Sequence, residues 1–456
     1  MNARIAKLIG VVMVATMLVT ACAPAATPTE SMATDVFVPT EAPMATAAPT
    51  EAPTMAPTEA MSQIDCMGAS SGDAITIVYQ WTGSEEENFN TILKPLVDAC
   101  GIKVTAQSTR DDAVLDTMVK STPPDVLFWP NFSPLKLYAD KLLPIASVGA
   151  QVDNYASFWS DMGMANGQLV ALPFKADVKS IIWYSPANFA AYGYNIPTTF
   201  DELNTLVEKM VADGNVPWSM GQGSDAATGW TGSDFIQDEL LATQGPAFVN
   251  SIISGDTPYN DPAVVSAYET YFKWASDAKY TVGGADGTLN TTFGDAILKV
   301  FSNPAEAMMV KQSGFAGGNV VAAYPDLKYG TDFDFFMFPG AQGLQGGADL
   351  MYAFSDSPAA KALVNYLTSE IGAVNMAATN WGLSPNKYAA GNYPDAQLGK
   401  LGDMLASTSG FTFDMGDAIG APFNTAEWTA IVNIVQGQDI QSNLDTVAAA
   451  QTEALK

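Results

Sequence analysis

The sequence predicts an α/β fold built on a parallel β-sheet, and the order of segments near the start of the folded part carries this prediction. Residues 75–79, 102–105 and 125–129 combine apolar and β-branched side chains as buried strands do. Apolar residues at helical spacing fill 89–97, and 113–120 fits a second helix. Strands that alternate with helices over short connections form parallel sheets covered by helices.

The middle of the chain repeats this alternation. A strand is predicted over 180–184, and a short helix follows it. Thr199 and Glu202 then have the spacing of a capping box, at the start of a helix with a regular apolar stripe. We therefore expect residues 179–300 to form a second, largely helical lobe.

Residues 1–21 have the features of a secretory signal peptide. Arg4 and Lys7 precede an apolar run over 8–20, which is short for a transmembrane helix. The run ends at Cys22 in a pattern that resembles the lipobox of bacterial lipoproteins. This resemblance implies cleavage before Cys22 and attachment of lipid to its thiol. The alternative is an uncleaved anchor with an incidental cysteine.

Residues 22–72 are predicted to form a disordered, lipid-anchored linker. Pro-Thr-Glu recurs four times in this stretch, among Ala, Thr and Met. Such a composition buries too little apolar surface to offset the entropy of ordering, and its prolines favour extended conformations. A glycosylated stalk is the alternative. We expect the folded part to be held on the extracytoplasmic face of a membrane, at the cell surface or in the periplasm.

Composition excludes several classes of function. The 456 residues carry a formal net charge of -28, which repels nucleic acids and anionic lipid headgroups. Histidine is absent, which removes Ser-His-Asp catalysis, Cys-His catalysis and histidine-ligated zinc. We therefore expect no nucleic-acid partner, no metal and no cofactor.

Two cysteines, Cys66 and Cys100, remain once Cys22 carries lipid, and they lie in an oxidising compartment. Cys66 precedes the first predicted strand, and Cys100 ends the first predicted helix. In a right-handed parallel unit both positions fall at the same end of the sheet. The sequence therefore favours a disulfide between them, with two free thiols as the alternative.

Several segments resemble family 1 extracellular solute-binding proteins. Residues 167–174 and the stretch 175–184 look like the first crossing between the lobes of that family. The segment 124–129 is similar to its maltodextrin-binding branch. Three segments are closer to α-glucoside-binding proteins: 175–180, 226–230 and 290–295. The resemblance covers roughly residues 73–456.

This resemblance implies a two-lobed, type II periplasmic-binding-protein-like fold whose lobes are joined by crossover strands. It places 73–176 and 303–345 in lobe 1, and 179–300 and 348–456 in lobe 2. It also implies a monomer that binds a small sugar in the interlobe cleft, an α-glucoside or other oligosaccharide, and delivers it to the permease subunits of an ABC importer. Two alternatives stay open: a secreted glycoside hydrolase, which needs two carboxylates across the scissile bond, and a solute receptor for a sensor kinase.

A sugar site needs aromatic platforms for C–H faces and polar side chains for hydroxyls. Trp81, Trp230 and Trp381 lie beside glycines or in polar loops, which favours a role in ligand binding. Trp129 ends a predicted parallel strand, and ligands of such sheets bind beyond the carboxyl ends of the strands. Tyr184 is a further candidate. Packing in the core is the alternative for each ring.

Polar candidates complete the predicted site. Lys175 and Asp177 alternate along an extended segment, so both side chains point to one face of the crossing. The polar candidates are Glu85, Asp125, Asn131, Lys175, Asp177, Gln222, Asp234 and Asp349. A surface ion pair is the alternative for Lys175 and Asp177. Asp234 fits a helix cap equally well, and Asp125 fits a contact that stabilises a loop.

Overall fold

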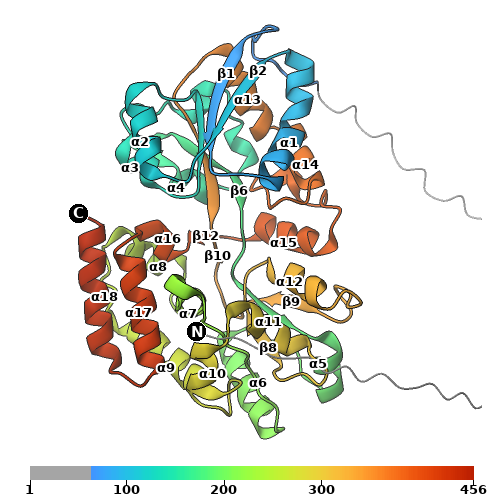
Figure 1. Ribbon diagram of the computed structural model, residues 1–456, viewed down its shortest axis with the longest axis vertical. Helices are drawn as coiled ribbons and strands as arrows, with labels where there is room; N and C mark the ends of the chain where they lie inside the picture. The colour runs from blue at the N-terminus through green and yellow to red at the C-terminus, as the bar shows by residue number, and fades with distance from the viewer. Residues whose placement is uncertain (1–62) are drawn as a thin grey trace, which may run out of the picture. The chain divides into compact units, whose positions relative to one another are not determined.

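The computed structural model describes residues 63–456. The predicted signal peptide over 1–21, the lipidation site Cys22 and linker residues 23–62 lie outside the described residues. The described part forms two lobes, drawn one above the other in Figure 1, and each contains its own β-sheet. Helices surround both sheets, which confirms the predicted α/β class.

Lobe 1 contains a five-stranded sheet in the order β2-β1-β3-β11-β6. Its strands are β1 (Ala74–Tyr79), β2 (Lys103–Ser108), β3 (Val126–Trp129), β6 (Ala171–Ala176) and β11 (Ala348–Ala353). As predicted, β1 is parallel to β2 and to β3. β11 is antiparallel to its two neighbours, β3 and β6. A short hairpin of β4 (Met164–Ala165) and β5 (Gln168–Leu169) precedes β6.

Two helical layers cover the sheet of lobe 1. Its helices are α1 (Ser84–Cys100), α2 (Asp112–Ser121), α3 (Ser133–Leu137), α4 (Ser157–Met162), α13 (Pro358–Thr368) and α14 (Glu370–Ala378), with the 3-10 turns η1 (Ile145–Val148), η2 (Val152–Asn154) and η4 (Lys387–Ala389). Side chains of β1 alternate between two hydrophobic clusters. Ile77 packs in the cluster that contains Leu93 of α1, and Val78 packs with Leu115 of α2. Burial on both faces explains why β3, in the middle of the sheet, is apolar throughout, whereas the edge strand β2 is largely exposed and polar.

Lobe 2 is mainly helical and contains an antiparallel sheet in the order β8-β7-β9. Its strands are β7 (Ile181–Tyr184), β8 (Met309–Lys311) and β9 (Asp334–Met337). Its helices are α5 (Pro186–Tyr192), α6 (Phe200–Ala212), α7 (Trp230–Thr243), α8 (Pro246–Ser254), α9 (Pro262–Ser276), α10 (Gly284–Asn290), α11 (Phe293–Phe301), α12 (Ala316–Ala323), α15 (Ala396–Ser407), α16 (Met415–Ile419), α17 (Phe423–Val435) and α18 (Ile440–Ala454), with the turn η3 (Asp225–Ala227).

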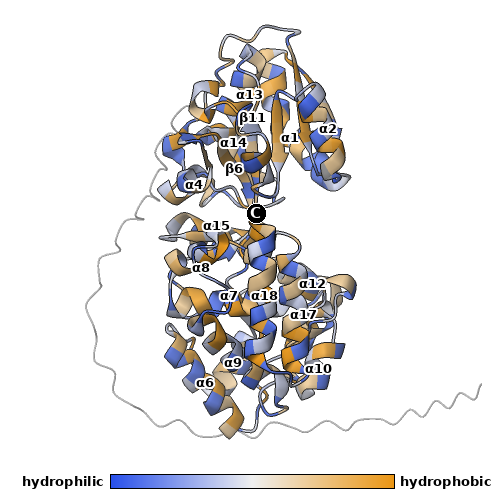
Figure 2. Ribbon diagram, turned by 90° about the vertical axis from the view of Figure 1, so that its left-hand side faces the viewer, coloured by the Kyte–Doolittle hydropathy of each residue, from blue (hydrophilic) through white to orange (hydrophobic). Residues whose placement is uncertain are grey.

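Helix α6 shows how local sequence selects these helices. Thr199 and Glu202 form the predicted capping box in both directions. Leu203, Val207 and Met210 then bury one side of the helix, while polar residues occupy the other. Figure 2 shows this mixture of hydrophobic and hydrophilic residues along α6.

The expected division of the chain between the lobes is wrong in two places. Residues 303–345 do not belong to lobe 1, because β8 and β9 both pair with β7 of lobe 2. The first part of 348–456 does not belong to lobe 2, because β11 lies between β3 and β6, and α13 packs against α1. Apolar periodicity predicts that a segment forms a strand and does not reveal which sheet accepts it.

Two of the connections between the lobes run side by side. One connection leads from β6 to β7, and two of its backbone amides donate to the second connection. The Asp177 amide donates to the Gly347 carbonyl over 2.9 Å, and the Lys179 amide donates to the Gln345 carbonyl over 2.8 Å. The second segment contains β10 (Leu344–Gly346), which pairs in parallel with β12 (Phe411–Phe413). The remaining connection leads from lobe 1 into α15.

The folded part begins earlier than the predicted linker boundary at residue 72. Ile64 and Met67 pack against the core of lobe 1. A disulfide joins Cys66 to Cys100 at the end of α1, the pairing that the sequence favours, and it closes a sequence separation of 34 residues. Within 63–456, no helix combines the length and the apolar character needed to cross a bilayer.

Candidate functional site

A cleft of about 430 Å³ lies where the two lobes meet. Lobe 1 and the adjoining connections contribute Pro130, Lys175, Ala176, Asp177, Gly347, Ala348, Asp349, Trp381, Gly382 and Leu383. Lobe 2 contributes Gly314, Phe315, Leu398, Leu401 and Asp417. The cleft therefore sits beyond the carboxyl end of β3, the position that the parallel sheet predicts.

The lobe 1 wall combines an indole ring with a charged cluster. The Lys175 ammonium lies 4.8 Å from the centre of the Trp381 ring, within cation–π range. It also lies 3.3 Å from Asp349 and 3.7 Å from Glu85. The Trp81 indole N–H donates to the same Asp349 carboxylate over 3.0 Å. These contacts fix the Trp381 platform and its polar neighbours in one geometry.

Asp177 projects from the connection that follows β6. Its side chain is exposed within the cleft, where its Oδ1 accepts from the Val178 amide over 2.9 Å. Desolvation by the surrounding protein raises the pKa of Asp177, although the charges of Lys179 and Lys175 oppose this shift. Its carboxylate therefore retains acceptor capacity for a bound ligand.

The lobe 2 wall is aromatic and carries one carboxylate. Phe315 is 42% exposed, which is unusual for so large an apolar ring and places its surface at the cleft. Behind it, the rings of Trp230 and Phe293 lie 6.5 and 6.0 Å from the Phe315 ring. Asp417, on the short helix α16, is exposed toward the same cavity.

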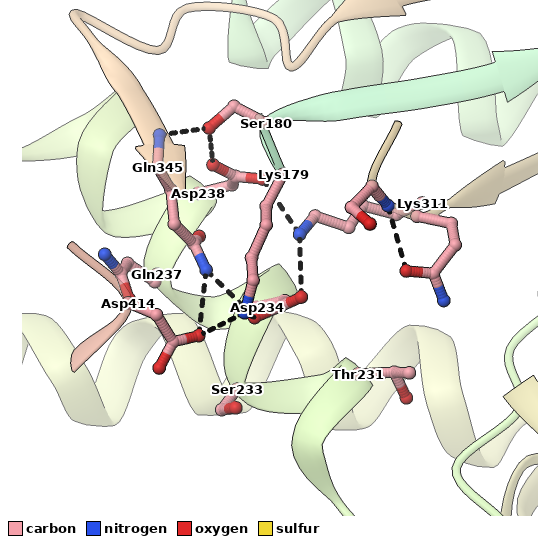
Figure 3. A network of polar contacts seen from close by, with 12 residues as sticks. Lys179, Ser180, Thr231, Ser233, Asp234, Gln237, Asp238, Lys311, Gln345 and Asp414 are labelled. Atoms are coloured by element: carbon pink, nitrogen blue, oxygen red, sulfur yellow. Dashed lines mark hydrogen bonds and ion pairs between the residues drawn. The ribbon is translucent and has the colours of Figure 1, made fainter. Parts of the chain in front are cut away.

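A buried polar network lies beneath this wall and joins the interlobe connections to α7 (Figure 3). Lys179 Nζ is 3.2 Å from Asp234 and 2.9 Å from Asp414. Lys311 Nζ is 3.1 Å from Asp238 and 3.8 Å from Asp234. Two ammonium groups thus share three buried carboxylates.

Neutral side chains extend the network to both connections. Ser180 donates to Asp238 and accepts from the Gln345 amide, and the Gln345 side chain donates to Asp234 over 3.0 Å. Gln237 donates to the Phe413 carbonyl over 2.7 Å. Every one of these partners on α7 is buried, so the network fixes the lobe 2 ends of the connections.

The pKa values of three carboxyl groups in this region, those of Asp234, Asp414 and Asp417, shift in different directions. Burial raises the pKa of Asp234 to about 7, against the opposing charges of Lys179 and Lys311. Burial acts on Asp414 too, but the ion pair with Lys179 holds the pKa of Asp414 well below its ordinary range. Desolvation and the nearby charge of Asp414 raise the pKa of Asp417 to about 6.

The structure brings together part of the predicted site. Lys175, Asp177, Asp349 and Trp381 line the cleft. Four more candidates lie directly behind its walls: Trp81, Glu85, Trp129 and Trp230. Of these, Trp81 and Trp129 are buried in the core of lobe 1, so they support the wall and present no open face.

Five candidates serve the fold at the positions where the structure places them. Asp125 lies at the start of β3, opposite the cleft, and accepts from the amide and hydroxyl of Thr76. The Asn131 side chain accepts from the Ser133 amide and so stabilises the turn before α3. The other three are buried in lobe 2: Tyr184, Gln222 and Asp234.

Each of these three buried side chains has a local partner. Tyr184 packs against Phe189 and Phe336 at the far end of β7. Gln222 donates to the Tyr271 hydroxyl. Asp234 binds Lys179 within the network. A polar side chain in a loop-like sequence can equally satisfy a buried partner, and sequence alone does not separate these two roles.

Sequence reasoning missed Phe315, Asp417, Leu398 and Leu401. Phe315 follows Ser313-Gly314, a loop-like setting equal to that of the chosen tryptophans, so the same argument applied to phenylalanine would have found it. Asp417 lies in a short helix after β12, and no periodic signal marks its exposed side. Among residues 63–456, no group of three or more potential ligands is arranged to hold a metal ion.

A family model described as bacterial extracellular solute-binding protein matches residues 82–374. The alpha-glucosides-binding periplasmic protein AglE of Rhizobium meliloti (strain 1021) is 33% identical over 405 residues, which cover 83% of this chain and 86% of the relative. The osmoprotective compounds-binding protein GgtB of Synechocystis sp. (strain ATCC 27184 / PCC 6803 / Kazusa) is 29% identical over 394 residues, covering 82% and 91% of the two chains.

Solved structures share the fold at lower sequence identity. The bacterial solute receptor AcbH superposes with a TM-score of 0.70 at 18% identity, covering 85% of this chain and 97% of the receptor. The apo form of RafE from Streptococcus pneumoniae gives a TM-score of 0.66 at 18% identity, covering 85% and 100%. Both likenesses concern the fold of the chain as a whole, since each covers 85% of it.

Proposed function

Because this chain belongs to the family of bacterial extracellular solute-binding proteins, we propose that it is the extracytoplasmic receptor of an ABC importer and binds a small sugar in its interlobe cleft. Within this proposal, the permease subunits of the importer receive the sugar, and lipid on Cys22 holds the receptor at the membrane. The ligand is an α-glucoside or another small oligosaccharide.

The composition of the cleft walls carries this proposal. Trp381 on lobe 1 and Phe315 on lobe 2 offer aromatic surface to one cavity, which suits the two C–H faces of a pyranose ring. One ammonium group and three carboxylates line the same cavity and can bond hydroxyl groups. The name of AglE supports this ligand class, since AglE is named for binding α-glucosides, whereas GgtB is named for osmoprotective compounds.

A panel of mono- and disaccharides tests the ligand. We expect an α-glucoside to raise the melting temperature, because a ligand that binds only the native state stabilises it by mass action. The same sugar should give a saturable change in tryptophan fluorescence and a binding isotherm by calorimetry. A panel without any saturable binding contradicts the sugar assignment.

Nitrophenyl glucosides separate binding from turnover. A receptor should leave them intact at all protein concentrations. Release of nitrophenol in proportion to protein concentration, lost on Asp177→Asn or Asp417→Asn, would instead support the hydrolase.

Fractionation of cells tests the anchor. Lipid on Cys22 should hold the protein with membranes, and Cys22→Ala should release it into the soluble extracytoplasmic fraction. Ser31→Ala is the matched control, because it is a change of similar size downstream of the lipobox-like sequence and leaves the Cys66–Cys100 disulfide intact. A Cys22→Ala protein that stays with membranes after a carbonate wash contradicts this anchor.

A further inference from the structure

More negatively charged than positively charged side chains line the cleft. Four ionisable side chains line it: Lys175, Asp177, Asp349 and Asp417. The single ammonium group, Lys175, already lies within 3.7 Å of both Asp349 and Glu85. Its charge is therefore balanced before any ligand arrives, and the negative charges of Asp177 and Asp417 set the sign of the cavity.

Asp177 and Asp417 differ from the other acids near the cleft in having no counter-ion. Among residues 63–456, no ammonium or guanidinium nitrogen lies within 4.0 Å of either carboxylate. The charge of Lys179 acts on both carboxylates, but its ammonium group is held by Asp234 and Asp414 in the network beneath the wall. Asp177 comes from a connection and Asp417 from lobe 2, so closure of the lobes would enclose a ligand between them.

We propose that Asp177 and Asp417 determine specificity by excluding solutes that carry an anionic group, so that the cleft admits neutral or amine-bearing polyols and rejects sugar phosphates and sugar acids. This inference rests on the proposed function and defines the ligand class of the same cleft. An anionic ligand would place like charges together in a cavity from which closure removes water, where screening is weak. Specificity of this kind comes from repulsion of the wrong ligand as well as from contacts to the right one.

A ligand hydroxyl that donates a hydrogen bond to Asp177 or Asp417 is attracted, whereas an anionic ligand group is repelled. Desolvation raises the pKa of Asp177, and desolvation together with Asp414 raises the pKa of Asp417. Desolvation thus outweighs the stabilising contacts of each ionised carboxylate, and a hydroxyl that donates to the carboxylate adds a further stabilising contact. A phosphate or carboxylate group supplies none.

Calorimetry with matched ligand pairs tests the proposal. The pairs are trehalose with trehalose phosphate, sucrose with sucrose phosphate, and glucose with glucuronate. For any pair whose neutral member saturates the protein, we expect the anionic member to bind at least about tenfold more weakly at low salt. The difference should narrow as ionic strength rises from ~0.01 to ~1 M, because the Debye length falls from about 30 to about 3 Å.

Asparagine substitutions identify the residues responsible. The double variant Asp177→Asn, Asp417→Asn keeps side-chain volume and should reduce the discrimination by about tenfold. Asp161→Asn on α4 and Asp326→Asn after α12 change the net charge equally, and both side chains are exposed away from the cleft lining. This control pair should leave the discrimination unchanged.

The possible outcomes separate the two hypotheses. Equal binding of neutral and anionic members overturns the charge proposal while the receptor function stands. The charge proposal is also overturned if anionic ligands are excluded equally at all salt concentrations and in the double variant, because the cause of exclusion is then steric. If no neutral sugar binds, the proposed sugar-receptor function fails. Binding of the anionic members alone in that case overturns the charge proposal directly.

Discussion

At the scale of single residues, the contacts of the Trp381 side chain determine the expected effect of its substitution on ligand binding. Its ring lines the cleft, lies nearly perpendicular to the Trp81 ring with ring centres 4.8 Å apart, and has the Lys175 ammonium over it. The ring thus belongs to the ligand surface and to the rim of the lobe 1 core at once.

Trp381→Ala should weaken sugar binding by about 1–3 kcal/mol, roughly 5- to 150-fold, because it removes apolar contact and releases Lys175 from its place. Trp428→Ala is the matched control: Trp428 is a partly buried tryptophan of α17 outside the cleft lining. Calorimetry measures both affinities, and circular dichroism checks that both variants fold. Equal affinities of the two variants for the sugar would show that Trp381 does not contact it.

Glu427 carries the clearest pH dependence of stability. It is fully buried in lobe 2, accepts from the Tyr259 hydroxyl, and has no hydrogen-bond partner for its Oε2. Burial raises the pKa of Glu427 from 4.5 to about 8. The native state therefore keeps a proton that the unfolded chain releases. The resulting stabilisation is complete below pH 4.5 and is lost as pH rises through 8.

Glu427→Gln should therefore behave like wild type near pH 5 and exceed it near pH 8 by on the order of 1–3 kcal/mol. Gln keeps the oxygen that accepts from Tyr259 and cannot ionise. Urea unfolding at the two pH values measures the difference. Glu453→Gln, an exposed position on α18, provides the control and should follow wild type at both. A gain at pH 5 as large as the gain at pH 8 would contradict the assignment.

The candidate site shows how far sequence reasoning reaches at the residue scale. Lys175 and Asp177 were predictable because strand alternation fixes their direction. Asp125 could not be separated from them, because a carboxylate at the start of a strand and one at its end look alike in sequence. Burial of Gln222 depends on α9 and α10, which contact it only in the folded chain. Direction along a strand is local information, whereas enclosure by distant elements is not.

At the scale of elements, α7 organises lobe 2. Residues 232–241 of this helix are all buried; Asp234 and Asp238 bind the connection that follows β6, and Gln237 binds β12, the strand paired with β10 of the second connection. Its first residue, Trp230, stands beside the Phe315 ring. The helix thus links the aromatic wall of the cleft to the lobe 2 ends of the connections, and Figure 3 shows its polar contacts with those ends.

Lys179→Met should destabilise the protein by about 3–5 kcal/mol, because it leaves Asp234 and Asp414 buried near one another without their shared cation. The double variant Lys179→Met, Asp414→Asn should recover part of that loss. Urea unfolding measures both.

Lys273→Met serves as the comparison. It breaks an exposed pair with Glu208 whose side chains are 51% and 52% accessible, and it should change stability by less than about 1 kcal/mol. A Lys179→Met variant as stable as Lys273→Met would show that the buried pair contributes no more than a surface one.

The elements themselves were more predictable than their partners. The strands β1, β2, β3 and β7 and the cap of α6 follow from local apolar patterns, because those patterns depend on neighbouring residues alone. The predicted lobe of β11 is wrong, because β11 inserts between β3 and β6. Both of these strands lie more than 150 residues earlier in the chain. No local pattern records this insertion.

At the scale of the whole molecule, the proposed function predicts that the lobes move about their connections. A sugar that contacts both walls stabilises the arrangement in which the walls lie closest, and so shifts the population of open and closed forms. The network on α7 holds Lys179, Gln345 and Asp414 in lobe 2. Bending should therefore concentrate on the lobe 1 side of these residues, where Asp177 and Gly347 meet through one backbone hydrogen bond.

Gly346 and Gly347 offer a matched pair for testing this hinge. A Cβ added at Gly346 would lie 1.9 Å from the Asp177 carbonyl oxygen, so the two connections can run side by side only because this residue has no side chain. A Cβ at Gly347 would meet nothing within 4 Å. Gly346→Ala should therefore push the connections apart, whereas Gly347→Ala should leave their spacing intact.

The expected result is a change in the relation between the lobes with each lobe still folded. Small-angle scattering on Gly346→Ala should show a smaller decrease in the radius of gyration on adding saturating sugar than wild type shows. Its affinity should fall about tenfold or more, since the cleft walls no longer meet the ligand together. Gly347→Ala should match wild type in the scattering measurement, which is the control here because Gly347 itself lines the cleft. If Gly346→Ala closes on sugar as wild type does, the contact between the two connections does not control closure, and the hinge lies elsewhere in the chain.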